Sequence, residues 1–544
     1  MIAKIWNHRT NNTTSAGFVL AIASLFSALL GLLRNRLIAG RFLPVERDIF
    51  FTALRIPDFI AAVLIMGAIS VAVVPLFREY TQKSEKEGWA FLSAVFNQMP
   101  LFLAVLSAIL IIFAPQIIKV IAPGFEAAIQ SQIIWLMRVM LLSPIILGLS
   151  TIISGILQCF DRFLVSSLAP IFHNLGIIIG IMFFVPWLGL IGLAWGMVLG
   201  ALLHLLVQLP SFFFLRSGCL PIFSWKHPGL RRLITLTIPR SLAIILNQAN
   251  LLIVTAVASF LAIGSVSVYN LAGDFSQALT RLIGVSFTTA VFPAMTLAFA
   301  RHDKKQFVKD FITSFKQIVF MIIPSSIIFI ILRAQLVRLI LGAGKFSWED
   351  TRLTAACLGL FCLGVFAQAL VTLVSRTFSA MQDNKTPAWI VFASVILNVL
   401  LIFTFLHFLG QDGSFHQGIS SLLRLKNISD IRIVGLPLAF SLSNIFQLIA
   451  LIFILRRRWS EPFLKDILLF SLRTLLASII MAFFVYTALY YMADQVNMER
   501  TIGIFWQVVV ALFAGLASYF IASYKLNRNE LIQIVSVLVR KPKK

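Results

Sequence analysis

Charged residues are scarce in this sequence of 544 residues, where they make up 12% against 59% hydrophobic residues. The mean hydropathy is +0.95. A soluble protein of this length needs far more charge to cover its surface, so the composition excludes that class. Charge-free runs long enough to cross a bilayer, such as Ala16–Leu33, recur from end to end. We therefore predict an all-α polytopic membrane protein.

The sequence also lacks the patterns of an enzyme or a metal protein. It has no HExxH, Walker A or nucleotide-binding fingerprint and no Ser/His/Asp order. His173 and His204 each stand alone in an apolar stretch, where packing or a backbone hydrogen bond explains them better than proton transfer. We expect no enzymatic activity, no metal and no cofactor, with energy supplied by the membrane potential or an ion gradient. The four cysteines form no CxxC pair and are expected to be inert; they are Cys159, Cys219, Cys357 and Cys362.

Acidic residues are few, with 21 Asp and Glu against 45 Lys and Arg and a formal net charge of +24. In a soluble protein this excess would suggest nucleic acid, but in a membrane protein basic residues collect in cytoplasmic loops and face anionic lipid. The basic segments 301–310, 456–466 and 525–544 then lie inside, and both termini are predicted to be cytoplasmic. No small-residue cleavage pattern precedes the first apolar run, which we interpret as a retained span.

Charges and Pro/Gly breaks divide the chain into about fourteen transmembrane helices. Two boundaries depend on turn residues, at Val185–Gly192 and at Ala262–Ser267. The long outside loop Leu409–Gly435 is expected to carry a short amphipathic helix around Ile419–Leu425. The predicted spans are 16–38, 52–77, 92–118, 132–158, 163–185, 189–215, 232–262, 266–299, 312–334, 352–376, 387–408, 432–455, 468–492 and 502–524.

Two sequence features recur at nearly the same offset. "AISVAVVP" at 68–75 resembles "SFTTAVFP" at 286–293, and the pair Gln158 and Asn174 recurs as Gln382 and Asn398. Both recurrences are six spans apart, which preserves orientation, so we predict two parallel six-helix repeats around a central cavity. The predicted domains are an N-lobe at 1–230, a C-lobe at 231–457, and two further helices with a basic cytoplasmic tail at 458–544.

Several motifs in order resemble one known family. They are "SRTFSAMQDNKTPAWI" at 375–390, "APGF" at 122–125, "LGAGKF" at 341–346, and "ALRIPDFI" at 53–60 followed by "FREY" at 77–80. These segments are similar to the MurJ (MviN) lipid II flippases of the MOP exporter superfamily. The resemblance implies a fourteen-helix fold with a cationic central cavity, and a groove for a polyprenyl tail formed partly by the last two helices.

The resemblance also implies a function. The substrate would be lipid II, a polyprenyl-pyrophosphate-linked peptidoglycan precursor, moved from the cytoplasmic to the outer leaflet of the bacterial plasma membrane by alternating access without covalent chemistry. We expect membrane lipid as a further partner, no nucleic acid, and activity as a monomer.

The first candidate site lies in "GLLRNRLIAGRF" at 31–42. Arg34 matches the family's cavity arginine in the first span, and a guanidinium binds pyrophosphate oxygens through two parallel hydrogen bonds. The alternative is that Arg34 and Arg36 reach the outer interface or pair with Asp48. Asp48 matches a family aspartate and is the expected partner of Arg34 within the substrate site.

Four more residues complete the predicted substrate-binding set. Arg55 and Asp58 stand three residues apart on one helix face, where they either pair or line the cavity entrance. Asp274 and Arg281 stand seven apart, so that Arg281 either supplies a cavity charge or neutralises Asp274. Arg240 is another candidate cation.

Other family cations are missing here. Ala28, Ala61 and the pair Gly273–Asp274 stand where the family has arginines. The alternatives therefore include an exporter of another lipid-linked oligosaccharide, a small-molecule antiporter and a transport-inactive scaffold. Arg34, Asp48 and the two extra helices favour a lipid-linked substrate, because an antiporter is expected to have about twelve spans.

Overall fold

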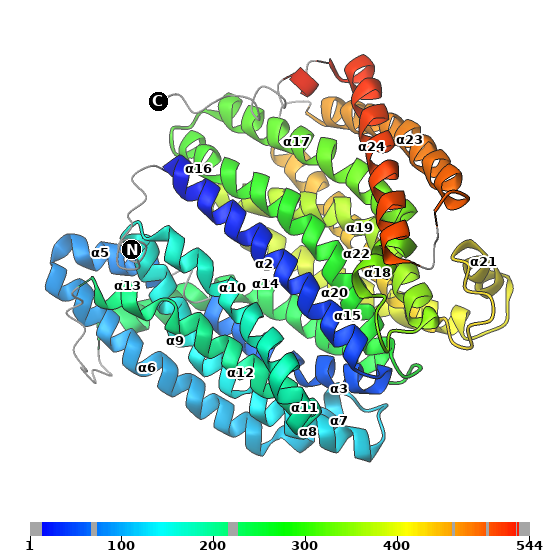
Figure 1. Ribbon diagram of the computed structural model, residues 1–544. Coiled ribbons are helices and arrows are strands. Elements are labelled where there is room, and N and C mark those ends of the chain that lie inside the picture. Colours follow the sequence, from blue (N-terminus) through cyan, green and yellow to red (C-terminus); the bar gives the residue numbers. More distant parts are fainter. Residues whose placement is uncertain are drawn as a thin grey trace. The chain divides into compact units, whose positions relative to one another are not determined.

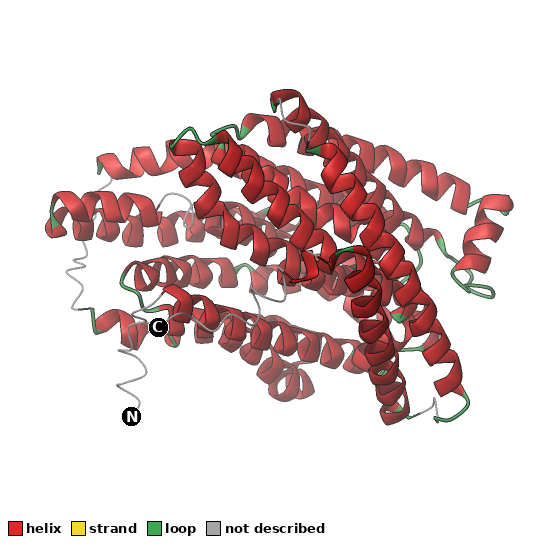
Figure 2. Ribbon diagram, turned by 90° about the horizontal axis from the view of Figure 1, so that it is seen from above, coloured by secondary structure: helices red, strands yellow, loops and turns green. Residues whose placement is uncertain are grey.

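The computed structural model describes residues 13–66, 73–215, 227–459, 463–496, 500–528 and 530–532. Within these ranges the chain forms helices joined by short connections, and no strand is present (Figure 2). This confirms the predicted all-α class. The helical ladder satisfies every interior backbone group inside its own segment, which a bilayer core requires.

Thirteen helices within the described residues are long and apolar enough to cross a membrane. They correspond to thirteen of the predicted spans. The remaining predicted span, 52–77, includes residues 67–72, which lie outside the described residues together with most of the first repeat motif at 68–75. The thirteen spans are Ile22–Arg41, Glu85–Ile112, Ala127–Cys159, Phe163–Leu188, Leu190–Phe213, Ser241–Ala258, Ser265–Ala300, Lys304–Ile331, Trp348–Ala380, Lys385–Leu409, Arg432–Arg458, Leu464–Ala493 and Thr501–Leu526.

Both turn-based boundaries are confirmed. Helix α11 (Val185–Leu188) ends at Gly189, whose φ of 60° suits a residue without a Cβ. Helices α14 (Pro228–Ala258) and α15 (Ser265–Leu279) are separated by a turn in which Gly264 has a φ of 98°. In the loop 409–435, α21 (Ser414–Leu422) is the expected amphipathic helix. It ends before the predicted Leu425 because Arg424 adopts a left-handed conformation.

The chain divides into two compact units, Met1–Val266 and Ser267–Lys544. The predicted lobe boundaries at 230 and 457 concern the sequence repeat and stay predictions. The first unit contains α2 (Thr13–Arg41), α3 (Pro44–Ala53), α4 (Arg55–Ile60), η1 (Ala61–Met66), α5 (Val74–Lys83), α6 (Glu85–Ile112), α7 (Ala114–Ile121), α8 (Ala127–Met140), α9 (Leu142–Cys159), α10 (Phe163–Ile179), η3 (Gly180–Phe184), α11, α12 (Leu190–Leu206), α13 (Leu209–Phe213) and α14.

Small residues bring α10 and α12 of the first unit into backbone contact. A Cβ added at Gly180, in the π-helical turn η3, would lie 2.2 Å from Cα of Gly196, and one at Gly176 would lie 2.4 Å from Cα of Gly200. These glycines are spaced four residues apart on each helix, the small-xxx-small pattern that lets membrane helices approach closely. Helix α2 then packs along the other side of α10.

In the second unit, the long helix α19 is the most buried span and packs against α17 and α22. Helices α23 and α24 pair with each other at the C-terminal end of the unit (Figure 1, orange and red). The helices after α15 are η4 (Thr280–Val285), α16 (Ser286–Ala300), α17 (Lys304–Ile331), α18 (Arg333–Leu341), α19 (Trp348–Ala380), α20 (Lys385–Leu409), α21, η5 (Arg432–Val434), α22 (Gly435–Arg458), α23 (Leu464–Ala493) and α24 (Thr501–Leu526).

One turn has the same geometry in both units. Helix α9 is followed by Asp161 in the left-handed region, and the N–H of Arg162 donates to the carbonyl of Leu157. Helix α19 is followed by Gln382 in the same region, and the N–H of Asp383 donates to the carbonyl of Phe378. Both are Schellman-type ends. The two left-handed residues are 221 positions apart, and the two sequence recurrences are 218 and 224 positions apart, which supports the predicted repeat.

Arg162 and Asp383, which directly follow the two left-handed residues, each contact the end of a later membrane span. In the first unit, Nη1 of Arg162 donates to the carbonyl of Ser211 at 2.5 Å. In the second, the carboxylate of Asp383 pairs with the guanidinium of Arg458 at 2.7 Å. Each contact joins the turn between the fourth and fifth helix of a repeat to the end of its sixth. Donor and acceptor are exchanged between the two units, so the connection is the same although the side chains differ.

Candidate functional site

The candidate site in the first unit is centred on Arg34, a half-buried residue of α2. Its Nε and Nη2 donate to Oδ1 of Asn35 at 3.2 and 3.0 Å. Its Nη1 donates to Oδ1 of Asn174 on α10 at 3.3 Å. The guanidinium plane is therefore fixed by an amide on its own helix and by an amide on the neighbouring helix.

Asn174 is itself held in one orientation. Its Nδ2 donates to the carbonyl and the hydroxyl of Ser27 on α2, both at 3.2 Å, and to the carbonyl of Pro170 one turn earlier. With the amide nitrogen facing these acceptors, the amide oxygen has to face Arg34. Asn174 therefore helps to set the orientation of the Arg34 guanidinium.

A second arginine of α2 contacts the same neighbouring segment. Arg41 lies seven residues after Arg34, two turns along the same face. Its Nη1 donates to the carbonyl of Ile181 at 2.7 Å, within the π-helical turn η3. A π-turn leaves backbone carbonyls outside the regular ladder, which makes them available to a side chain. Arg36 lies between the two and is half-buried.

Asp48 is buried in α3, with 1% of its surface exposed. Its Oδ2 accepts a hydrogen bond of 2.6 Å from the N–H of Gly264, in the turn between α14 and α15. The short charge-assisted contact fixes that turn. The role of Asp48 in substrate binding, as the partner of Arg34, stays a prediction.

Arg55 and Asp58, the predicted pair near the start of the second span, both lie in α4. Arg55 begins α4, and its Nε donates to the hydroxyl of Thr255 on α14 at 2.8 Å. Asp58 lies three residues later and is exposed. Arg55 therefore ties α4 to α14. The predicted function of the two residues at the cavity entrance stays a prediction.

The predicted residues of the second unit lie on α15 and η4. Asp274 is half-buried and Arg281 is exposed. Nε of Arg281 lies 3.4 Å from the carbonyl of Gln277, and Arg281 makes no ion pair with Asp274 within the described part of the chain. Arg281 is the second residue of the π-helical turn η4, and its predicted role toward Asp274 stays a prediction. The structure describes no side chain for Arg240.

A polar cluster that the sequence did not reveal lies beside this site. The rings of His173 and His204 face each other edge to face with centroids 6.3 Å apart. Nδ1 of His204 lies 2.6 Å from the hydroxyl of Ser150, which also accepts from Nε2 of Gln208 at 2.8 Å. Oε1 of Gln208 accepts from Ser154. His173 directly precedes Asn174, so adjacent residues of α10 serve the arginine site and the histidine cluster.

These contacts define the chemistry available. An oriented guanidinium can donate two parallel hydrogen bonds to an anion that offers two acceptor oxygens, such as a phosphate or pyrophosphate. Within the described residues, no group of three or more His, Cys, Asp or Glu is placed to hold a metal ion. The arrangement therefore suits binding and release of an anionic group.

Comparison with curated proteins gives consistent relatives. The family model described as lipid II flippase MurJ matches residues 44–511. The chain is 30% identical over 427 residues to the probable lipid II flippase MurJ of Buchnera aphidicola subsp. Acyrthosiphon pisum, covering 76% of this chain and 84% of that protein. It is 28% identical over 400 residues to the lipid II flippase MurJ of Burkholderia cenocepacia, covering 72% and 78% respectively.

Solved structures agree with these relatives. A lipid II flippase MurJ in an inward closed conformation matches with a TM-score of 0.75 at 25% identity, covering 94% of this chain and 99% of that one. A multidrug resistance MATE family transporter of the MOP superfamily matches with a TM-score of 0.63 at 14% identity, covering 79% and 94%, and shows a shared fold. The extent of these matches places this multi-pass membrane protein, with its arginine site between α2 and α10, in the lipid II flippase MurJ family.

Proposed function

We propose that this protein moves lipid II from the cytoplasmic to the outer leaflet of the bacterial inner membrane, as a step of peptidoglycan biosynthesis. The observation that carries the mechanism is the guanidinium of Arg34, oriented by the amides of Asn35 and Asn174. Pyrophosphate offers pairs of oxygens that match the two parallel N–H groups of a guanidinium. Arg34 then binds the charged linkage of the substrate, and lipid II crosses without any bond being made or broken.

The membrane potential provides a source of energy. An anionic headgroup that moves outward from a negative interior gains about 2.3 kcal/mol per charge per 100 mV. An arginine oriented by its amide partners binds this headgroup on one side and releases it on the other as the lobes rock. We propose that potential or an ion gradient drives transport, and that one chain suffices.

The other functions considered fit less well. A small-molecule antiporter of the superfamily does not need the helix pair α23–α24 that follows the two repeats. A scaffold does not need an arginine oriented between two membrane helices, because such a residue is costly to insert. Family membership favours lipid II over another lipid-linked oligosaccharide.

The test is transport in cells that lack their own flippase. The chain is expressed in a strain depleted of its lipid II flippase, and the lipid II accessible at the outer leaflet is measured with an external enzyme or label. We expect restored growth together with restored outer-leaflet lipid II. Growth without outer-leaflet lipid II, or neither despite normal protein level, would contradict the proposed substrate.

Asn174 gives a prediction about how Arg34 is positioned. Asn174→Asp keeps an oxygen acceptor but adds a carboxylate that neutralises Arg34, so we expect flipping to fall about tenfold or more. Asn174→Ala removes the orientation but leaves the charge, so the loss should be smaller. The measurement is the outer-leaflet lipid II rate at matched protein level. Equal rates for Asn174→Asp and the wild type would separate Asn174 from the site.

The orientation of the chain gives a second prediction. In a background without native cysteines, single cysteines at His302 and Lys525 should resist a membrane-impermeant thiol reagent in whole cells, whereas one at Ser414 should react. All three side chains are exposed, so burial does not protect them. Permeabilised cells, in which all three sites should react, are the control. Labelling of His302→Cys but not Ser414→Cys in intact cells would reverse the proposed topology.

A further inference from the structure

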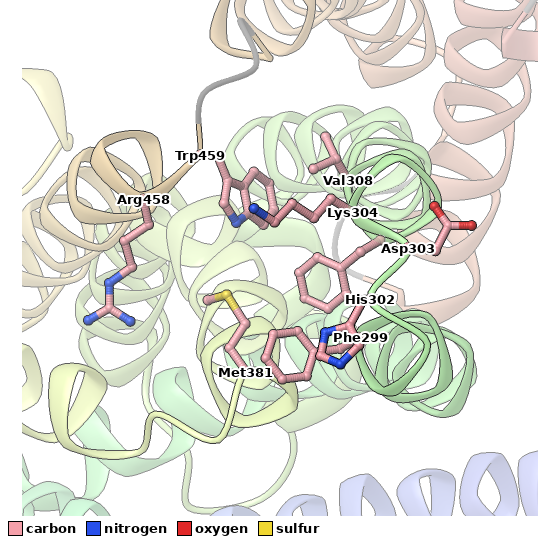
Figure 3. A pocket seen from close by; sticks show the side chains of 9 residues that line it. Phe299, His302, Asp303, Lys304, Val308, Met381, Arg458 and Trp459 are labelled. Carbon is pink, nitrogen blue, oxygen red and sulfur yellow. The ribbon is translucent and has the colours of Figure 1, made fainter.

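A cavity of about 310 Å³ lies within the second unit. It is lined by the end of α16, the start of α17, the turn between α19 and α20, and the end of α22. Figure 3 shows its lining side chains, with Met381 between Arg458 on one side and Lys304 and His302 on the other. The remaining lining residues are Phe299, Asp303, Phe307, Val308 and Trp459.

Cationic and neutral donors reach into this cavity. The ammonium of Lys304 extends toward Trp459 (Figure 3) and makes no hydrogen bond or ion pair with other described residues. The same holds for the ring of His302, whose backbone lies in the left-handed region with a φ of 57°. This is a Schellman-type helix end, because the N–H of Asp303 donates to the carbonyl of Ala298 at the end of α16. Lys304 and His302 are therefore available to an incoming acceptor.

The acidic groups nearby are already engaged. Oδ1 of Asp303 accepts from the N–H of Gln306 at 3.0 Å and caps α17, with its carboxylate turned away from the other lining side chains (Figure 3). Asp383 pairs with Arg458 at 2.7 Å and accepts from the hydroxyl of Thr386 at 2.6 Å. Burial raises the pKa of the Asp383 carboxyl, but the hydrogen bonds from Thr386 and Arg458 outweigh it, so the pKa lies below its usual range. Asp383 therefore stays ionised and fixes Arg458 at the edge of the cavity.

The surrounding field is positive. The three segments 301–310, 381–385 and 456–459 carry eight Lys or Arg against three Asp. Such a concave basic site attracts an anion more strongly than a single surface lysine does. The ligand is therefore expected to be anionic, with an apolar part that contacts the aromatic rings of Phe299, Phe307 and Trp459.

The position of the cavity at the ends of two membrane spans indicates which kind of anionic ligand it binds. Lys304 is the first residue of one candidate membrane span, and Arg458 is the last residue of another. A site at the ends of membrane helices, with a tryptophan and basic side chains, lies at the height of lipid headgroups. A phospholipid can place its phosphate there while its glycerol and upper acyl carbons lie against the apolar wall. A soluble acidic peptide would gain nothing from that position.

We propose that this cavity binds the phosphate of one anionic phospholipid, held by Lys304 and His302 with Arg458 at its edge. The bound lipid joins the start of α17 to the end of α22 and to the α19–α20 turn. This is a site for a resident lipid and is independent of the transport of lipid II through the Arg34 site.

The test compares two lysines on the same helical turn. The full chain is placed in nanodiscs of phosphatidylcholine with about one-tenth phosphatidylglycerol, and co-retained phosphatidylglycerol is counted by native mass spectrometry. Lys304→Gln should lower retention about fivefold, the factor that corresponds to about 1 kcal/mol per basic residue at an anionic surface. Lys305→Gln removes the same charge from a residue that does not line the cavity, so it should retain lipid like the wild type.

A second variant keeps the charge and fills the space. Met381→Trp should also displace phosphatidylglycerol. The Lys304→Gln and Met381→Trp proteins should both remain monodisperse. Equal losses for Lys304→Gln and Lys305→Gln would mean a diffuse surface effect and overturn the proposal, as would equal retention of phosphatidylcholine and phosphatidylglycerol. If Lys304→Gln weakens retention of added lipid II or of a soluble acidic peptide but not of phosphatidylglycerol, the cavity serves that other ligand and the proposal is wrong.

Discussion

Arg34→Ala is expected to lower the rate of lipid II flipping by about 30-fold or more while the protein remains folded in the membrane. Removing one partner of a buried charged contact costs about 2–5 kcal/mol, much of it because the remaining charge loses its partner. Here that remaining charge would be the substrate pyrophosphate. Folding should survive because Asn174 keeps its hydrogen bonds to Ser27 and Pro170 when Arg34 is truncated.

Two further variants define what Arg34 supplies. Arg34→Lys should recover only part of the rate, since an ammonium keeps the charge but loses the two-pronged geometry. Arg36→Ala, two residues away on the same helix, is the matched control and should have a mild effect. Outer-leaflet lipid II is measured together with protein level. If Arg34→Ala transports normally, or fails only because the protein disappears, Arg34 is a structural anchor and the proposed mechanism is wrong.

Much of the fold followed from the sequence because membrane spans are local features. Thirteen predicted spans have a matching helix, and the turns at Gly189 and Gly264 were placed correctly. A long apolar run needs no information about its neighbours to be a membrane helix. The π-helical turns η1, η3 and η4 were not predicted, because nothing in the residues around Ala61, Gly180 or Arg281 distinguishes a π-turn from a regular helix. The role of Arg281 toward Asp274 stays a prediction.

The site could be predicted only in part. Arg34 was identified through its rarity in an apolar run and its match to a family position. Its partner Asn174 is 140 residues away, and the sequence indicated it only as a member of a repeat. The contact between His173 and His204 was missed for the same reason, since pairs on different helices have no spacing rule. A repeated polar residue in two membrane spans was the signal that marked Asn174.

The second variant with a large expected effect changes the glycine contact between α12 and the segment formed by α10 and η3. Gly180→Leu is expected to remove most folded protein from the membrane, because even the first carbon of the new side chain would lie 2.2 Å from Cα of Gly196. The clash is with backbone, so it cannot be relieved by a rotamer change. Overpacking a tight contact typically costs about 1–3 kcal/mol and occasionally more, and a backbone clash should reach the upper end. Gly180→Ala should show a smaller loss in the same direction.

Gly418→Leu is the matched control, because a Cβ at Gly418 meets no atom within 4 Å. Protein level and monodispersity after extraction are the measurements, with flipping as a second readout. Gly180 directly precedes Ile181, whose carbonyl accepts from Arg41, and α10 also carries Asn174. Gly180→Leu should therefore lose protein and transport together, whereas Arg34→Ala should lose transport alone. A well-folded Gly180→Leu protein would mean that α10 and α12 do not need their close approach, and that the helix carrying Asn174 is positioned by other contacts.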